Sequence, residues 1–348
     1  EKIMAIYING RFLEKNLTGI QRYAMEVTKQ LDKMNISEEI YLLKPKKCKY
    51  DLNFKNIKII ELNFLNDNLW EQITVPLYLL FKRKSKLLNM CNSAPVLKPG
   101  YVVLHDIAFK TRNNHLTKAF IWWYSWITRL NIKRYKKIFT VSNFSKHEIM
   151  DVYKIPEQKI CIAYPSAENI KNIKEDDSVL AELQLKKQSF VFSLGSKSEH
   201  KNHQFIVEMA AKSPDFTFVV SGMTNNRVLK NGINNDVPLN NIINTGYISD
   251  KKLISLYRNC KLFIFPSLYE GFGLPPLEAI SCGCKKIVVN NLEVFHEIYG
   301  DNVNYLDCNG KVYDLKKEFL NFHDSSNTIL KKYSWTKTSK IIIDEVLK

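Results

Sequence analysis

Short apolar runs alternate with helical patterns along this chain of 348 residues, and the alternation starts twice. Buried strands separated by amphipathic helices are typical of parallel sheets covered by helices. The first series predicts strands at 4–8, 40–43, 57–62, 101–104 and 138–141, and helices at 20–34, 69–82, 117–134 and 145–152. The second predicts strands at 190–194, 216–220, 242–244, 262–265 and 286–289, and helices at 203–211, 251–259, 277–282 and 293–299.

The two series predict an α/β protein with two Rossmann-like, doubly wound domains. A chain of this length suits two cores of about 160 residues better than one. We expect an N-terminal domain over 1–166, a polar linker with one short helix over 167–187, a C-terminal domain over 188–330 and a final helix over 331–348.

The most informative segment is 265–283, which holds two carboxylates, Glu270 and Glu278, on either side of a change in local structure. The apolar run at 262–265 predicts a buried strand that leads into this segment. We expect Glu270 in the loop after that strand and Glu278 one turn into the helix that follows. Both carboxylates are then able to face one pocket.

The residues between the two glutamates favour a loop that approaches a ligand closely. Gly271 and Gly273 give the backbone that freedom. Pro275 and Pro276 suit the first turn of a helix, where no amide donor is missed. Amides at a helix start bind anions, and carboxylates accept hydrogen bonds from hydroxyls such as those of sugars.

This segment resembles the E-x7-E signature of retaining glycosyltransferases of group 1, or family 4, whose GT-B architecture has two Rossmann-like domains facing each other across a cleft. In that family the first glutamate contacts the donor sugar, the next amides hold sugar and diphosphate oxygens, and the second glutamate binds the ribose. The resemblance assigns these roles to Glu270, to the amides of Gly271, Phe272, Gly273 and Leu274, and to Glu278. A salt-bridging or helix-capping pair of surface glutamates is the alternative.

Two segments of the first domain match the family in order. Gly19, in the run 18–23, resembles the glycine loop near the donor diphosphate, although the family often has two glycines there. His105 and Asp106 end a predicted strand, where open α/β sheets place ligand groups. They resemble the family's His-Asp pair, in which the histidine lies beside the donor sugar and can approach the acceptor. A turn glycine and a structural histidine are the alternatives, and we expect Ser145 to be a helix N-cap.

The run 194–202 opens the second domain and resembles the family's glycine loop for the leaving diphosphate. The resemblance places Gly195 in that loop and makes Lys201 the lysine that neutralises the diphosphate. His200 stands where arginine is common, and Ser196 replaces another frequent basic residue. Lys197 can substitute only as a point charge, because lysine lacks the fork of arginine. A solvated surface lysine run is the alternative.

The segment 244–250 resembles the one that borders the nucleotide base, with Ser249 or Asp250 as a helix cap. Four aromatic residues at 122, 123, 124 and 126 cannot share one helix face, so we expect some of them to be exposed. A position at a membrane interface and packing in the helix layer both remain open for them.

The chain has 51 basic and 35 acidic residues and a net charge of +16. Anionic lipid at the inner membrane surface is the partner that we expect, because an enzyme with a lipid-linked acceptor works there. Nucleic acid and a merely solvated basic surface are the alternatives. No segment approaches the ~18 apolar residues of a spanning helix, and the N-terminus lacks a signal-peptide pattern. We therefore expect a cytoplasmic, peripheral membrane protein.

Seven cysteines form no Cys-x-x-Cys pair, so we expect reduced thiols rather than a disulfide or zinc framework. No Asp-x-Asp motif is present, so we expect no cofactor and no metal. The resemblance implies a retaining hexosyltransferase with His105, Lys201 and Glu270 as catalytic residues. It also implies a final helix that crosses back to the first domain. By analogy the chain resembles bacterial surface-polysaccharide enzymes such as those of lipopolysaccharide O-antigens or capsule. For this chain we favour GDP-mannose as the donor, with glucosyl, N-acetylhexosaminyl, fucosyl and rhamnosyl donors as alternatives. A non-catalytic sugar-nucleotide-binding protein is the alternative, followed by a nucleic-acid-binding protein.

Overall fold

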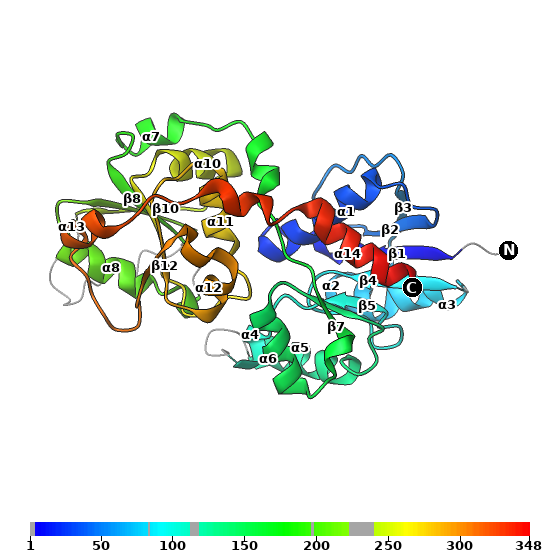
Figure 1. Ribbon diagram of the computed structural model, residues 1–348. Coiled ribbons are helices and arrows are strands. Elements are labelled where there is room, and N and C mark those ends of the chain that lie inside the picture. The colour runs from blue at the N-terminus through cyan, green and yellow to red at the C-terminus, as the bar shows by residue number, and fades with distance from the viewer. Residues whose placement is uncertain (1–3, 83, 112–117, 196–197, 223–239) are drawn as a thin grey trace. The chain divides into compact units, whose positions relative to one another are not determined.

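The computed structural model describes residues 4–82, 84–111, 118–195, 198–222 and 240–348 (Figure 1). The chain forms two compact units by its internal contacts. One comprises Glu1–Pro165 together with Ser334–Lys348, and the other is Ser166–Tyr333. Each unit contains one sheet in which every strand pair is parallel, as the alternating pattern predicts.

The first sheet has seven strands in the order β3-β2-β1-β4-β5-β6-β7. Their bounds are β1 Ala5–Asn9, β2 Glu39–Pro45, β3 Lys58–Leu62, β4 Ser85–Asn89, β5 Tyr101–Val103, β6 Ile138–Thr140 and β7 Ile160–Ile162. The five predicted strands of this half are present. β4 and β7 were not predicted, because β4 begins with two polar residues next to a basic cluster and β7 is only three residues long.

The helices of the first unit also follow the prediction closely. They are α1 Gly19–Lys33, α2 Asp67–Leu69, α3 Val75–Leu80, α4 Ala108–Thr111, α5 Lys118–Asn131, α6 Asn143–Tyr153 and α14 Trp335–Leu347. A π-helical turn, Trp70–Thr74, joins α2 to α3. Short 3-10 helices at Gly10–Glu14 and Glu157–Lys159 complete the unit.

One face of the first sheet is covered by α3, α5 and α6. Tyr7 of β1 lies opposite Leu87 of β4 in the parallel register. Asn89, two residues further along β4, lies opposite Val102 of β5. Side chains in register or two apart point to the same face of a sheet. Tyr7 and Leu87 pack with the helix residues Trp70, Val75 and Leu79, and Val102 packs in the cluster that holds residues of α5 and α6.

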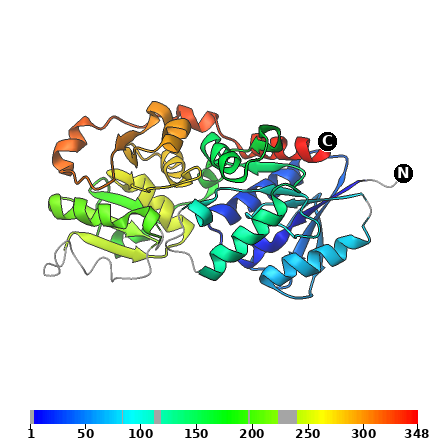
Figure 2. The same cartoon turned by 90° about the horizontal axis from the view of Figure 1, so that it is seen from below.

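The helix α14 belongs to the first unit, although the whole second unit lies between it and the rest of the first unit in the sequence. It packs against α1 (Figures 1 and 2). The ring of Trp335 meets the ring of Tyr23 edge-on, with centroids 5.5 Å apart. Lys137 forms an ion pair of 2.9 Å with Glu345. The first unit is therefore built from two separate stretches of chain.

The second sheet has six strands in the order β10-β9-β8-β11-β12-β13. Their bounds are β8 Phe190–Leu194, β9 Thr217–Ser221, β10 Ile242–Gly246, β11 Leu262–Phe265, β12 Ile287–Asn290 and β13 Asn304–Leu306. The helices are α7 Ser178–Glu182, α8 His203–Lys212, α10 Asp250–Asn259, α11 Leu274–Ser281, α12 Glu293–Tyr299 and α13 Leu315–Glu318, with short 3-10 helices at Glu168–Asn172, Glu199–Lys201, Gly300–Asn302, Phe319–Asn321 and Asn327–Lys331. The strand β13 was not predicted, because it has three residues and no apolar run.

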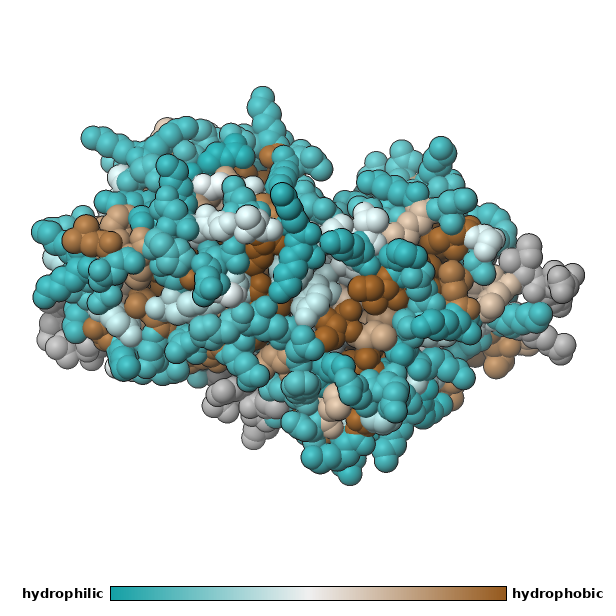
Figure 3. Space-filling model, in the orientation of Figure 1, coloured by the Kyte–Doolittle hydropathy of each residue, from teal (hydrophilic) through white to brown (hydrophobic). Residues whose placement is uncertain are grey.

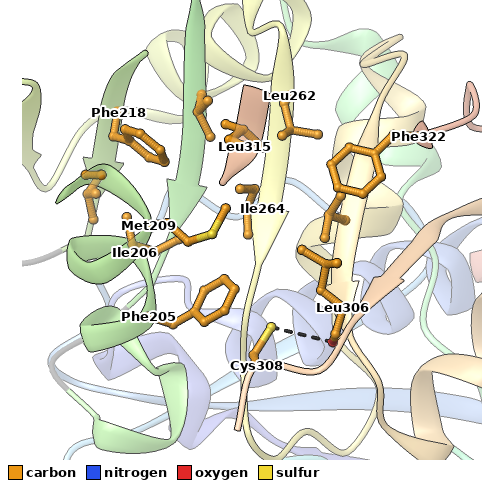
Figure 4. Close-up of a cluster of buried hydrophobic side chains, with 14 residues drawn as sticks. Phe205, Ile206, Met209, Phe218, Leu262, Ile264, Leu306, Cys308, Leu315 and Phe322 are labelled. Carbon is orange, nitrogen blue, oxygen red and sulfur yellow. Dashed lines mark hydrogen bonds between the residues drawn. The ribbon is translucent and has the colours of Figure 1, made fainter. Parts of the chain in front are cut away.

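One buried hydrophobic cluster of the second unit lies between a face of its sheet and α8 (Figure 4). Phe205 and Met209 of α8 pack on Ile264 of β11 and Phe218 of β9. The segment 167–187 also belongs to this unit. Asp177 accepts a 2.6 Å hydrogen bond from Ser255 of α10, and Glu182 accepts one of 2.6 Å from Lys252 of the same helix, so the segment is attached to the fold between its ends.

All seven cysteines are free thiols, and the sulfur atoms of Cys260 and Cys284 lie 3.5 Å apart in the core. Within the described parts of the chain, no helix has the length and apolarity needed to cross a bilayer.

Candidate functional site

The segment that connects β11 to α11 carries the two glutamates. The four residues of β11 are buried, and α11 begins at Leu274 with a proline in its first turn, as the two consecutive prolines predict. The helix starts three residues earlier than the sequence indicates. Glu270 therefore lies in the loop and Glu278 lies inside the helix, as expected.

Gly273 occupies a position that only glycine tolerates. It is the N-cap of α11 and has φ +80° in the left-handed region, which strains residues with a side chain. A Cβ atom at this position would collide with the ring of Phe295 from α12. The path of the loop before α11 therefore depends on both the backbone freedom of Gly273 and its lack of a side chain.

Tyr299, at the end of α12, holds this turn by two hydrogen bonds. Its hydroxyl donates to the carbonyl of Gly273 and accepts from the amide of Leu277 at 3.2 Å. Burial raises the pKa of Tyr299 well above its ordinary value, so the hydroxyl stays protonated and can donate. The loop and the first turn of α11 are thus fixed by one side chain.

Glu278 is buried, and Tyr257 of α10 donates a 3.2 Å hydrogen bond to its Oε2. A buried carboxylate needs such donors, because leaving it unpaired in the interior is costly. Burial, with the Glu278 charge as a further cause, raises the pKa of the neighbouring Cys282 thiol to about 12. That thiol stays protonated, so it is no nucleophile.

Glu270 forms an ion pair with Lys201, and each side chain is largely shielded from water. The ammonium of Lys201 also lies 5.2 Å from the ring centroid of Phe265, the last residue of β11. The structure therefore brings together two residues that the sequence separates by 69 positions. An ion pair of this kind neutralises both groups when no ligand is bound.

Backbone contacts fasten the Lys201 segment to the loop of Glu270. The amide of Leu268 donates to the carbonyl of His200 at 2.7 Å. Asn202, in the left-handed conformation at φ +53°, donates its side-chain amide to the carbonyls of Pro266 and Cys308. These bonds hold Lys201 at the ends of β8 and β11, where parallel sheets place ligand groups.

Gly195, the residue after β8, also has no room for a side chain. A Cβ atom there would collide with the ring of His203, and a Cβ atom on Gly222 would collide with the Gly195 carbonyl. The backbone after β8, at Gly195, therefore lies close to the backbone after β9, at Gly222. The sequence left Lys197 to supply the positive charge that Ser196 lacks near the leaving diphosphate. Both residues lie outside the described residues.

In the first unit, His105 follows β5 and is buried. Its Nε2 lies 3.1 Å from the Met90 carbonyl, and its amide donates to Asn92 at 2.7 Å. Because a carbonyl only accepts, Nε2 carries the proton and Nδ1 is the acceptor nitrogen. Burial lowers the pKa of His105 to about 4, and the ring is therefore neutral at neutral pH.

The first unit also contains a buried polar network that the sequence did not reveal. Arg11 donates to Glu71 at 3.2 Å and to Ser93 at 3.0 Å, and Asn9 donates to Glu71 and Asn89. Burial alone would lower the pKa of Arg11, but the Glu71 carboxylate raises it above its ordinary value. Glu71 lies in the π-helical turn, a distortion often found at functional positions.

The remaining expected residues of the first unit are near chain turns. Gly19 is the first residue of α1, and a Cβ atom there would meet nothing within 4 Å, so the space beside it is open. Asp106 accepts a 3.0 Å hydrogen bond from the amide of Ala108 at the start of α4. The prediction that Ser145 is an N-cap was wrong. The cap is Ser142, which accepts from the Ser145 amide, because the helix begins at Asn143.

In the second unit, Ser249 caps α10 by accepting from the Lys252 amide at 3.4 Å, one of the two expected caps. Among the residues that the structure describes, no group of three or more His, Cys, Asp or Glu side chains could hold a metal ion.

Comparison with protein families identifies the second unit. The family model described as glycosyl transferases group 1 matches residues 176–333. These residues form a group 1 glycosyltransferase domain. The domain contains β8 to β13, both glutamates, Lys201 and the glycines that shape the turns around them.

Two curated relatives and one solved structure extend the likeness beyond the group 1 domain. The chain is 25% identical over 231 residues to the O-antigen chain mannosyltransferase RfbU of Salmonella typhimurium, covering 65% of this chain and 62% of that protein. It is 28% identical over 215 residues to the O-antigen chain mannosyltransferase B of Escherichia coli, covering 59% and 56%. The chain thus spans about three fifths of the length of these relatives.

The structure of Anabaena Alr3699/HepE in complex with UDP and glucose has a TM-score of 0.68 and 13% identity, and the alignment covers 99% of this chain and 100% of that one. At this identity the likeness concerns the fold, which is the GT-B fold predicted from the sequence. The expectation of two Rossmann-like parallel sheets is confirmed.

Several residues that shape the site of the group 1 domain were not singled out from the sequence. Tyr257, Asn202, Phe295 and Tyr299 hold Glu278, the Lys201 segment and the Gly273 turn. Tyr299 precedes a glycine near a predicted helix end, a weak signal by itself. Their roles depend on contacts between distant elements, which periodicity does not report.

Proposed function

We propose that this protein is a retaining glycosyltransferase that transfers a hexose from a nucleotide-sugar, with GDP-mannose favoured, to a lipid-linked glycan in the synthesis of O-antigen or capsule. The observation that carries the proposal is the arrangement of Glu270, Glu278 and Lys201 around the β11–α11 turn of a group 1 domain. The names of the two mannosyltransferase relatives support the donor and the pathway.

In this proposal Glu278 accepts hydrogen bonds from the ribose hydroxyls, and Glu270 accepts from hydroxyls of the donor sugar. The amides of Gly271, Phe272, Gly273 and Leu274 take the sugar and diphosphate oxygens at the start of α11. Anions are stabilised at that position by the helix dipole and by amides without a helical partner. Gly19 and Gly195 let the backbone approach the diphosphate.

The ion pair of Lys201 and Glu270 supports a specific order of events. Binding of the donor replaces one pair by two, since Lys201 turns to the diphosphate and Glu270 to the sugar. In the transfer step the bond between the anomeric carbon and the β-phosphate oxygen breaks, and an acceptor hydroxyl forms the new bond on the same face. The acceptor proton passes to the leaving phosphate, and Lys201 stabilises the negative charge that develops there.

His105 and Asp106 act on the sugar and acceptor side in this proposal. A neutral His105 with its proton on Nε2 offers Nδ1 as an acceptor for a sugar hydroxyl. No metal or other cofactor takes part, a proposal supported by the lack of an Asp-x-Asp motif in the sequence. The protein acts at the cytoplasmic face of the membrane, without nucleic acid as a partner.

The first experiment is a thermal-shift screen with UDP, GDP, dTDP and their sugars in the presence of EDTA. Stabilisation by a guanosine nucleotide and its mannose conjugate is expected. If none of these compounds raises the melting temperature, the proposed function is wrong. If EDTA abolishes the stabilisation, the metal-free part of the proposal is wrong.

Two variants test the assigned roles. Glu278→Ala should weaken nucleotide binding by about 1.5 to 3 kcal/mol, the range for hydrogen bonds to a charged group. Glu270→Ala should reduce transfer more than nucleotide binding. Glu293→Ala, an exposed glutamate of the same domain, is the matched control. Wild-type binding and activity in both variants would contradict the assignment.

One observation favours a second candidate, a sugar-nucleotide-binding protein without transfer activity. His200 occupies the place where related enzymes often have an arginine, so fewer positive charges face the leaving group. Donor binding without either transfer or hydrolysis, with several acceptor-lipid extracts supplied, would favour this candidate. His200→Arg should then leave donor binding unchanged. Transfer activity that appears in this variant would mean that the missing charge is what limits transfer.

A further inference from the structure

The helical segment from α2 to α3 in the first unit presents an apolar face to solvent. From residue 69 to residue 81, every exposed side chain is a large hydrophobic one: Leu69, Ile73, Leu77, Leu80 and Phe81. Phe81 is 84% exposed. The opposite face of the same segment is also largely apolar, since Trp70, Val75 and Leu79 are buried on the sheet beside Glu71 and Thr74. A helix that is apolar on both faces has a second apolar environment to meet.

The helix α5 has a comparable outward face. Trp122 is 63% exposed, and its ring stacks on that of Trp126 with centroids 5.9 Å apart. Leu130 continues this row at the next four-residue step, and all three side chains are exposed. Tryptophan side chains are enriched at membrane interfaces, where an apolar ring and a polar N–H group are both accommodated.

Cations accompany the tryptophans on α5 and just after its end. Arg129 is exposed and lies seven residues after Trp122, which places both on one side of α5, and the exposed Lys133 lies two residues after the helix ends. With Lys110 of α4 and Tyr153 of α6 they line a pocket of about 460 Å³. The ammonium of Lys110 lies 4.8 Å from the centroid of the Tyr153 ring. Three cations at one opening suit a phosphate group.

These two apolar faces lie on the same side of the first unit, because α3 and α5 cover the same face of its sheet. Figures 1 and 2 show the two helices on that side. Hydrophobic residues also reach the surface of the first unit in Figure 3, surrounded by hydrophilic ones. We call the exposed residues of 69–81 together with Trp122, Trp126, Arg129, Leu130 and Lys133 the α3–α5 surface.

The charge of this part of the sequence indicates what the surface meets. Between residues 72 and 147 there are fourteen lysines and arginines and a single acidic residue, Asp106. A protein partner with an apolar patch would not require this excess. A bilayer with anionic phospholipids provides both a negative surface and an apolar layer beneath it.

We propose that the α3–α5 surface docks the protein on a bilayer of anionic phospholipids. Leu77, Phe81, Trp122 and Trp126 enter the interface, and the pocket of Lys110, Arg129 and Lys133 receives a headgroup phosphate. The inference deepens the proposed function and rests on it for its purpose, because a transferase with a lipid-linked acceptor must work at the membrane.

The test is flotation of the full chain with vesicles of phosphatidylcholine alone or with about a third of phosphatidylglycerol. Binding is expected only to the anionic vesicles and should weaken at high salt. The double variants Leu77→Ser/Phe81→Ser and Trp122→Ser/Trp126→Ser should each bind roughly tenfold more weakly, because they bury less apolar area. Arg129→Gln/Lys133→Gln should lose about fivefold for each charge removed.

The controls change exposed residues of the second unit. Leu320→Ser matches the apolar variants, and Lys316→Gln/Lys317→Gln matches the charge variant. Controls that lose as much binding as the test variants would overturn the proposal, as would absence of vesicle binding by the wild type. A dimer in solution that Phe81→Ser dissociates, without vesicle binding, would also overturn it and identify a second copy as the partner.

A separate measurement keeps this test independent of the proposed function. Thermal shifts with nucleotide-sugars, recorded without vesicles, report donor binding alone, and the surface variants should leave them unchanged. Vesicle binding without any donor binding would sustain the surface and contradict the transferase. Donor binding without vesicle binding would contradict the surface and leave the transferase standing.

Discussion

The candidate residues of the two units occupy similar positions, after a strand of a parallel sheet, but they are held in different ways. His105 is fixed by the Asn92 side chain and the Met90 carbonyl, and Arg11, Glu71 and Ser93 of the same unit form a separate buried polar network. Glu270 lies on a loop shaped by glycines, and its partner is Lys201, a flexible side chain.

This difference separates two tasks within one chain. In the first unit the polar groups satisfy each other, so disturbing them should affect the free energy of unfolding before it affects a ligand. In the second unit the backbone determines the shape of the site, and in the proposed function the ion pair opens when the donor binds. Changes there should affect ligand binding before stability.

The largest effect is expected for Arg11→Met. It leaves the Glu71 carboxylate buried without its cation and should lower the free energy of unfolding by about 3 to 5 kcal/mol. All five tryptophans belong to the first unit, so urea unfolding followed by tryptophan fluorescence reports that unit. Lys15→Met breaks the exposed pair with Asp67 and is the control, with an expected loss below about 1 kcal/mol. Equal losses in both variants would contradict the difference between buried and exposed pairs.

The next effect is a pH dependence from His105. Its pKa is about 4 in the folded protein and 6.5 as its ordinary value, so the unfolded chain binds more protons between these limits. The contribution of His105 to stability is complete above pH 6.5 and is lost as the pH falls toward 4, for a total of about 3 kcal/mol. Urea unfolding at several pH values should show a shallower slope for His105→Gln. An identical slope would mean that His105 is not the titrating group.

Gly273→Ala comes third and tests the second unit. The left-handed conformation and the collision with Phe295 should cost about 2 to 3 kcal/mol of stability and should abolish most nucleotide binding. Gly283→Ala is the matched control, since it has φ +87° but open space around it. Circular dichroism gives the stability and calorimetry gives the nucleotide affinity. If the control loses as much affinity, the shape of the turn is not what binds the nucleotide.

The smallest effect is expected for Tyr299→Phe. Loss of the hydroxyl that bridges Gly273 and Leu277 should cost about 1 kcal/mol of stability. Because the loop is then less fixed, nucleotide affinity should decrease by more than stability alone predicts. Calorimetry at a temperature where the variant is fully folded measures this. A variant with wild-type affinity would indicate that Phe295 and the backbone suffice to hold the turn.

The sequence was a sufficient guide where a feature is local. The strands at 190–194 and 262–265 and the helix at 293–299 have the predicted bounds, because each is an uninterrupted apolar or amphipathic pattern. The strand β4 begins with two polar residues, and β7 and β13 have only three residues each, so their pairing with neighbouring strands was not evident from the pattern.

The candidate site divides in the same way. Glu270 and Glu278 were found from one segment, and the turn between them follows from glycine and proline chemistry. The pair of Arg11 and Glu71 joins residues 60 positions apart, and the contact of Lys201 with Glu270 spans 69. No periodicity of the sequence encodes these distances. They appear only when the strands are placed in order.

The return of α14 to the first unit also affects how the protein is made. Residues 166–333 are one continuous stretch, whereas the first unit needs Ser334–Lys348 to cover α1. During synthesis the second unit can close while the first still exposes Tyr23, the residue that lies between Trp335 and His105. The ribosome therefore completes the group 1 domain before it has synthesised α14, the last helix of the other unit.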